Sequence, residues 1–175
     1  MVDLANLTTR SLCAECGILG FKCGNDAIDK WLLKHSLPKH NIYKTRVTTF
    51  HEGDNMDVLG FYALSIVLEF AKELKGTFDV RGMAQGGVFP AMHLNYLAVR
   101  KQDQDQGLGG IMMSEVLDHF CHLAEVSGVE IMTLVPLDSK VSAFYQRRKF
   151  VPYGQGKLLI DARRAIAERD RARSV

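Results

Sequence analysis

One stretch of the sequence, residues 94–110, constrains the fold of this chain more than any other. It begins with a short apolar run at residues 94–99, which predicts a buried strand. Between this run and a later helix lies the pattern Gln104-x-x-Gly107-x-Gly109. The helix is predicted from apolar residues at helical spacing: Ile111, Met112, Val116, Leu117, Phe120 and Leu123. The stretch therefore predicts a strand, a tight glycine-containing turn and a helix N-terminus in direct succession.

A turn between a strand and a helix is suited to binding an anion. The first N–H groups of a helix have no intrahelical acceptor, and the helix dipole adds partial positive charge there. A Walker loop is excluded because Gly110 and Ile111 follow the last glycine of the pattern, and a Rossmann fingerprint is excluded by the glycine spacing. Two interpretations remain: a solvated turn before a core helix, or the pyrophosphate loop of an acyl-CoA-dependent N-acyltransferase.

Composition indicates an ordinary globular protein. The chain has 175 residues, of which 47% are hydrophobic and 24% charged, and we expect one domain over residues 1–175 with a charged tail at 161–175. The formal net charge of +2 neither requires nor excludes a nucleic-acid partner. No apolar run approaches a membrane span and no signal-peptide pattern is visible, so we expect a cytoplasmic protein without membrane association.

The cysteines raise the question of a metal or redox site. Cys13-x-x-Cys16 has no second pair of ligands at zinc-site spacing, and Gly17 and Gly20 follow it where a thioredoxin-like motif would open a helix. In the cytoplasm thiols stay reduced. We therefore predict free structural thiols and no metal site, with a metal or redox role as the alternative.

The remaining elements are predicted from local patterns. Asn25 or Asp26 should cap a helix that carries Ile28, Trp31, Leu32 and His35 on one face and ends or bends at Pro38. Strands are predicted at 7–12, 44–50, 58–66, 94–99, 130–135, 150–153 and 157–160, a helical turn at 69–75, a loop at 76–90, a short helix capped by Ser139 at 139–148, and a surface helix at 163–173.

The order of these elements and two motifs resemble the GNAT family of N-acetyltransferases. The first motif is Leu97-Ala98-Val99 with Gln104-x-x-Gly107-x-Gly109, and the second is the segment from Ala143 to Phe150 with the sequence AFYQRRKF. Lys149 stands where the family often has glycine. The resemblance covers residues 21–160. It implies an α/β (α+β) fold with a mixed central sheet of about six to seven strands, helices on both faces, and two parallel strands that diverge to bind acetyl-CoA.

A narrower resemblance joins two further segments. Phe21-Lys22-Cys23-Gly24 with Ile28, Trp31 and Leu32, and later Gly60-Phe61-Tyr62-Ala63-Leu64, are similar to a toxin subgroup of bacterial toxin–antitoxin pairs. That subgroup acetylates the amino acid on charged tRNA and so blocks translation. The resemblance implies aminoacyl-tRNA as substrate and a ribbon-helix-helix antitoxin as partner, and it is compatible with a homodimer.

The resemblance also implies site residues. Acetyl-CoA would contact backbone of the strand and the turn, at Leu97, Ala98, Val99, Gln104, Asp105, Gln106, Gly107, Leu108, Gly109 and Gly110. Asp103, Asp105 and Gln106 lie where many relatives carry arginine. Carboxylates facing a pyrophosphate would be unfavourable by roughly 1 kcal/mol for each pair of unit charges about 4 Å apart in water. Arg100 and Lys101 are placed to offset them.

Tyr145 is the predicted catalytic residue, as the acid that protonates the departing CoA thiolate. A tyrosine has a pKa near 10 and is protonated at neutral pH. The alternative is a core tyrosine beside Phe144 and Phe150. No general base is evident; His51 and His93 are candidates, and an α-amino group with a pKa near neutrality needs no strong base.

Three basic segments are candidates for contact with a phosphate backbone: residues 34–46, 147–149 and 163–173. Two other functions stay open. One is a GNAT enzyme that acetylates a small amine or a protein lysine. The other is an inactive GNAT-fold module held in a complex with a DNA-binding antitoxin.

Overall fold

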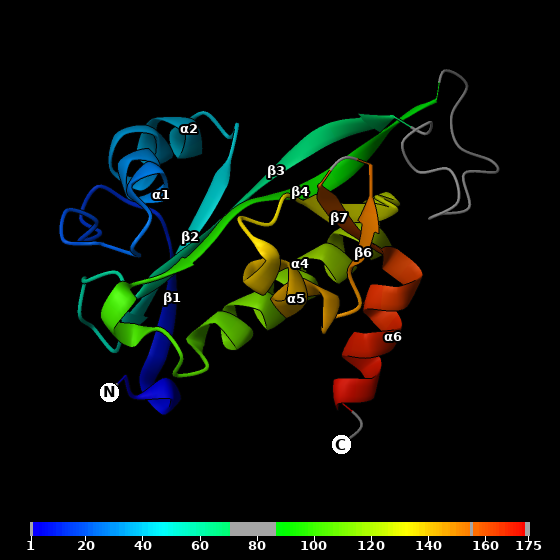
Figure 1. The fold of residues 1–175 in the computed structure, drawn as a ribbon. Helices are drawn as coiled ribbons and strands as arrows, with labels where there is room; N and C mark the ends of the chain where they lie inside the picture. The colour runs from blue at the N-terminus through cyan, green and yellow to red at the C-terminus, as the bar shows by residue number, and fades with distance from the viewer. Residues whose placement is uncertain (1, 71–86, 155, 174–175) are drawn as a thin grey trace. The chain divides into compact units, whose positions relative to one another are not determined.

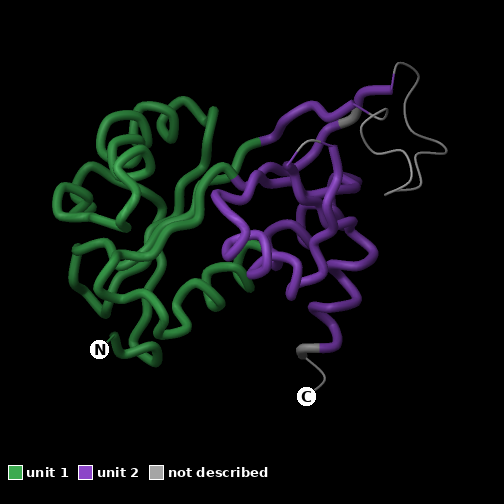
Figure 2. Tube along the Cα trace, viewed as in Figure 1, with its two compact units in different colours: residues 1–65, 95–116 green, residues 66–94, 117–175 purple. Residues whose placement is uncertain are grey.

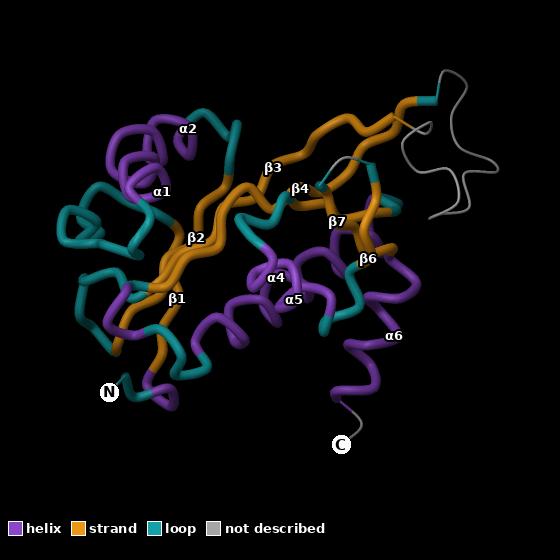
Figure 3. The backbone as a smooth tube through the Cα atoms, in the orientation of Figure 1, coloured by secondary structure: helices purple, strands orange, loops and turns teal. Residues whose placement is uncertain are grey.

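The computed structural model describes residues 2–70, 87–154 and 156–173, and its strands join in one mixed sheet (Figures 1 and 3). Within these residues the sheet has seven strands in the order β1-β2-β3-β4-β5-β7-β6. The β4–β5 pair is parallel, whereas the β1–β2, β2–β3, β5–β7 and β6–β7 pairs are antiparallel. The strands are β1 (Leu7–Ser11), β2 (Arg46–Glu52), β3 (Gly60–Phe70), β4 (Val88–Val99), β5 (Ile131–Leu134), β6 (Val151–Tyr153) and β7 (Lys157–Asp161). The mixed sheet predicted from the sequence is confirmed.

The helices include those predicted after Asn25, after Gly107, at 139–148 and at 163–173, together with two short 3₁₀ helices that were not predicted. In chain order the helices are η1 (Leu4–Asn6), α1 (Asp26–Trp31), η2 (Leu32–Ser36), α2 (Leu37–Asn41), η3 (Lys101–Asp103), α4 (Leu108–Ser127), α5 (Ser139–Gln146) and α6 (Ala162–Arg173). None of the helices in the described part of the chain is both long and apolar enough to cross a membrane.

The chain forms two compact units, coloured separately in Figure 2. Unit 1 comprises residues 1–65 and 95–116, and unit 2 comprises residues 66–94 and 117–175. The expected site residues therefore divide: the end of β4 and the following turn belong to unit 1, and Tyr145 belongs to unit 2.

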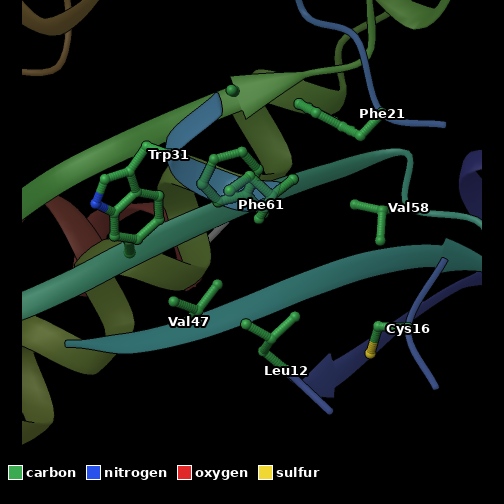
Figure 4. Packing of buried hydrophobic residues seen from close by; sticks show 10 residues of the cluster. Leu12, Cys16, Phe21, Trp31, Val47, Val58 and Phe61 are labelled. Carbon is green, nitrogen blue, oxygen red and sulfur yellow. The ribbon is translucent and has the colours of Figure 1, made fainter. Parts of the chain in front are cut away.

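The core of unit 1 brings together the two segments of the narrower resemblance (Figure 4). The ring of Trp31 from α1 stacks on Phe61 from β3, with centroids 6.2 Å apart, and Phe21 meets the same Phe61 ring edge-on at 5.4 Å. Tyr96 of β4 lies 4.3 Å from Trp31. These aromatic contacts hold α1 and the residues before it against β3 and against β4, the strand that precedes the turn at residues 104–107.

Helix α1 begins as predicted but does not end at Pro38. The Asn25 side chain accepts hydrogen bonds from the N–H groups of Ala27 and Ile28. The helical path then widens into the π-helical turn η2 and continues as α2, with Pro38 in its first turn. Proline is tolerated there because the first N–H groups of a helix need no intrahelical acceptor. The sequence pattern did not predict the π-helical turn.

Unit 2 holds a smaller core and a buried polar group. Ala91, Ile131, Tyr153 and Leu159 form the apolar cluster. Beside it, the buried carboxylate of Glu69 accepts hydrogen bonds from the Tyr153 hydroxyl at 2.8 Å and from the Lys157 ammonium at 3.1 Å. Pairing of this kind offsets the cost of burying a charge.

Several predicted boundaries were wrong. Strand β3 continues to Phe70, so the start of the helical turn predicted at 69–75 is strand; the rest of that turn lies outside the described residues. Strand β4 begins at Val88, after Gly87 at φ 67°, whereas the sequence predicts a loop to Pro90; residues 76–86 also lie outside the described residues. Asp138, not Ser139, caps α5, because its side chain accepts from the N–H of Val141.

Candidate active site

The parallel strands β4 and β5 stop pairing partway along β4. Their register runs from Met92 opposite Met132 to Leu94 opposite Leu134, where the ladder ends. Strand β4 nevertheless continues to Val99. Within the described residues, the segment 95–99 has no β5 partner, because β5 itself ends at Leu134. The divergence of the two strands that the resemblance implies stays a prediction.

The turn after β4 presents a run of unused backbone donors. Asp105 and Gly107 adopt positive φ values of 61° and 91°, and α4 begins at Leu108. Among the described residues, the N–H groups of residues 105–109 have no hydrogen-bond acceptor, whereas the next amide, Gly110, donates to the Gly107 carbonyl. Consecutive free amides at a helix N-terminus form a site for an anion.

The acidic residues of the turn behave differently from one another. Asp103 is buried, and its carboxylate lies 2.5 Å from Nε of Arg100. Asp103 therefore does not face the free amides as an uncompensated charge, and Arg100 is already committed to it. Asp105 is exposed to solvent, where its charge is screened.

The side chains of Gln104 and Gln106 bind other parts of the protein. Nε2 of Gln104 donates to the carbonyl oxygens of Cys23, at 2.8 Å, and Val99, at 3.0 Å. Oε1 of Gln106 accepts from the N–H of Val2 at 3.0 Å, and its Nε2 donates to the Gln102 carbonyl. The sequence placed both residues at the cofactor but gave no sign of these partners, because Cys23 and Val2 are distant in the chain.

Tyr145 lies in unit 2, in the last turn of α5. Its ring is buried between Phe144 and Phe150, with centroid distances of 5.1 and 5.7 Å. Within the described residues its hydroxyl has no hydrogen-bond partner. Burial raises the pKa of Tyr145 above its ordinary value, and the charge of Arg148 lowers it by a smaller amount. Tyr145 therefore carries a protonated hydroxyl group on a ring that is packed between two apolar aromatic side chains.

The two candidate bases differ in their surroundings. His51 is fully buried, with Nε2 2.8 Å from the Thr49 hydroxyl and Nδ1 3.1 Å from the Asp57 carbonyl, so both ring nitrogens are in use. His93 has Nδ1 2.8 Å from the Thr133 hydroxyl. Burial lowers the pKa of both histidines. The surroundings of His51 are those of a core residue.

The cysteines are free thiols. Sγ of Cys13 lies 2.8 Å from Sγ of Cys16, and their hydrogen bond contributes most to raising the pKa of Cys13. Burial raises the pKa of Cys23 to about 11, so this thiol is protonated at neutral pH. Among the described residues, no cluster of three or more histidine, cysteine or acidic side chains is arranged to hold a metal ion.

Two of the three basic segments meet in unit 2. Nη1 of Arg164 lies 3.5 Å from the carbonyl oxygen of Lys149, which brings α6 to the turn after α5. Arg147, Lys149, Arg163 and Arg164 are exposed there. Three of the arginines of α6 form ion pairs: Arg164 with Asp161, Arg169 with Glu125 and Arg171 with Glu168. The third basic segment, at residues 34–46, lies in unit 1.

Comparison with known proteins places the fold. No protein-family model matches the chain, and no curated protein sequence matches it. Among solved structures, a Tyr-to-Phe variant of KacT is 22% identical with a TM-score of 0.85, covering 93% of this chain and 99% of KacT. AtaT complexed with acetyl-methionyl-tRNAfMet is 20% identical with a TM-score of 0.81, covering 90% of this chain and 95% of AtaT.

A third similar structure is a Tyr-to-Phe variant of the AtaT toxin bound to the C-terminus of the antitoxin AtaR and to acetyl-CoA. It is 20% identical with a TM-score of 0.77, covering 93% of this chain and 98% of that one. The chain therefore shares its fold with the KacT and AtaT structures along nearly its whole length, which agrees with the fold predicted from the sequence.

Proposed function

We propose that this chain is an acetyl-CoA-dependent N-acetyltransferase. The observation that carries the proposal is the run of free N–H groups at residues 105–109, in the turn between β4 and the N-terminus of α4. The pyrophosphate of acetyl-CoA accepts hydrogen bonds from these amides, and the dipole of α4 adds favourable potential. The amide-rich pantetheine arm pairs with the backbone of residues 97–99. Two similar structures support this assignment: AtaT complexed with acetyl-methionyl-tRNAfMet, and an AtaT variant bound to acetyl-CoA.

The proposed chemistry needs one side chain from this protein. The nitrogen of the acceptor amine attacks the thioester carbonyl, the carbon–sulfur bond breaks, and the electron pair leaves on sulfur. The Tyr145 hydroxyl donates its proton to that thiolate, the amine loses a proton to solvent, and Tyr145 regains a proton from solvent. A raised pKa keeps Tyr145 protonated before the reaction. An α-amino group with a pKa near neutrality is partly unprotonated already, so the step proceeds without a strong base.

The proposed acceptor is the amino group of aminoacyl-tRNA, which makes the chain the toxin of a toxin–antitoxin pair. The likeness to AtaT complexed with acetyl-methionyl-tRNAfMet supports this substrate class. The likeness to AtaT bound to its antitoxin supports an antitoxin as partner, and we propose one of the ribbon-helix-helix type. Acetylation of charged tRNA in the cytoplasm would then block translation.

A transfer assay tests the proposal and separates it from the open alternatives. The protein is incubated with acetyl-CoA labelled in the acetyl group and, in parallel, with charged tRNA, uncharged tRNA, small amines and a lysine-containing protein. We expect label on charged tRNA only, at the aminoacyl group. Transfer to an amine or a lysine instead would establish the metabolic or protein-modifying enzyme. Absence of any transfer, with acetyl-CoA bound or not, would favour the inactive module.

The basic surface formed by Arg147, Lys149, Arg163 and Arg164 gives a prediction about tRNA. Replacing Arg147, Lys149 and Arg163 together by glutamine should raise the KM for charged tRNA by roughly tenfold or more and leave kcat nearly unchanged. The slope of log affinity against log salt should fall by about 1 for each phosphate that the variant no longer neutralises. The control is Arg171→Gln, which removes a charge already paired with Glu168. An unchanged salt slope in the triple variant would show that tRNA binds elsewhere.

A further inference from the structure

The turn that carries the free amides is fastened at two points by side chains. Gln104 joins it to Cys23, and Gln106 joins it to Val2. The hydrogen bonds of these two side chains direct them to backbone groups of the protein and away from a ligand. Asp105 lies between the two attached residues, and residues 107–109 directly follow the second. Asp105 and Gly107 have positive φ values.

The first attachment ends on a firmly held segment. The N–H of Cys23 donates to Oδ1 of Asp29 in α1 at 2.9 Å, and the N–H of Lys101 donates to the Lys22 carbonyl at 2.7 Å. Asp29 is itself buried. Gln104 therefore connects the turn to a part of unit 1 that is fixed by α1, and its second bond, to Val99, fixes the turn to the end of β4.

The second attachment ends on the N-terminal segment, which is anchored in turn to the end of β2. The N–H of Asp3 donates to Oε1 of Glu52 at 2.9 Å, and the N–H of Gly53 donates to the Asn6 carbonyl at 2.8 Å. Val2 is buried. Leu4 also approaches the turn, since its Cδ1 lies 3.8 Å from the position of a Cβ built on Gly107.

We propose that Gln104 and Gln106 are positioning residues for the cofactor, and that they act as a brace which holds the amides of residues 105–109 ready for the pyrophosphate. This inference rests on the proposed function and deepens it. Free amides in a loose turn would rotate and hydrogen-bond to water in many arrangements, and ordering them would reduce the affinity for acetyl-CoA. With the brace in place, that ordering is completed before the cofactor binds.

The brace is tested with methionine variants, which keep the length of the side chain and remove its donors and acceptor. Gln104→Met and Gln106→Met should each weaken acetyl-CoA binding by roughly five- to fiftyfold, the range for one or two net hydrogen bonds. Binding of S-acetylpantetheine, which lacks the pyrophosphate, should be unchanged. The matched control is Gln102→Met in the same turn: its side chain is exposed, and only its carbonyl takes part in the brace.

The outcomes are distinct. Calorimetry gives the affinity for acetyl-CoA, NMR titration gives that for S-acetylpantetheine, and the melting temperature reports stability. Equal affinities of wild type and both variants for acetyl-CoA would overturn the brace and leave the proposed function intact. An equal loss for both ligands together with a lower melting temperature would show a purely structural role and also overturn it. Failure of the wild-type protein to bind acetyl-CoA would instead overturn the proposed function.

Discussion

Replacing Gly109 by aspartate is expected to weaken acetyl-CoA binding on the order of 10²-fold or more while the protein stays folded. A Cβ at this position meets its nearest neighbour, Cγ2 of Val99, at 3.8 Å, an ordinary contact. A carboxylate in the first turn of α4 is compatible with the helix dipole, so the fold should hold. The same carboxylate repels the pyrophosphate by about 4 kcal/mol for each pair of unit charges about 4 Å apart, at an effective dielectric constant near 20.

Gly109→Asn is the matched control, because asparagine has the size of aspartate without its charge. Calorimetric titration of both variants with acetyl-CoA measures the difference, and circular dichroism verifies the fold. Gly107→Asp should abolish binding too, but less informatively, since its φ of 91° strains any residue with a Cβ. Equal affinity of Gly109→Asp and wild type would remove the basis for placing the pyrophosphate at this turn.

The second large effect is expected from Tyr145→Phe, which should lower turnover by about 10²–10⁴-fold, the usual range for a positioned acid. The KM for acetyl-CoA should hardly change, because the hydroxyl matters only as charge develops on sulfur. The contacts of the ring with Phe144 and Phe150 remain in the variant. Since the hydroxyl has no partner in the described part of the chain, its loss should leave the melting temperature nearly unchanged.

Tyr153→Phe provides the contrast. Tyr153 is a buried tyrosine of the same unit, but its hydroxyl donates to the buried carboxylate of Glu69 at 2.8 Å. Removing this donor should lower the melting temperature and leave turnover intact. If Tyr145→Phe behaves in the same way as Tyr153→Phe, Tyr145 is a core residue and another group protonates the thiolate.

The sequence predicted helices, strands and turns correctly where residues close together in the chain determine them. The cap at Asn25, the succession of β4, turn and α4, and the hairpin of β6 and β7 follow from neighbouring residues alone. The wrong predictions concern residues whose conformation and burial depend on contacts with residues distant in the sequence. Glu69 was predicted to begin a helical turn, yet it lies buried in β3, where Tyr153 and Lys157 donate hydrogen bonds to its carboxylate.

The candidate site shows the same division. The glycine spacing located the turn, because backbone conformation is encoded by the residues of the turn itself. Asp103 looked like a charge facing the ligand, and only its burial beside Arg100 shows otherwise. The bonds from Gln104 to Cys23 and from Gln106 to Val2 join residues more than eighty positions apart, and no pattern within one segment of the sequence carries that information.

The free amides of residues 105–109 have a consequence for any measurement made on this protein. A row of N–H groups recognises oxygen atoms with negative charge and not the molecule to which they belong. Under the proposed binding mode, inorganic phosphate, sulfate and pyrophosphate in a buffer compete with acetyl-CoA for the same donors. Their presence multiplies the apparent dissociation constant by one plus the ratio of anion concentration to its own dissociation constant. An affinity quoted for this site describes the protein together with the salt in which it was dissolved.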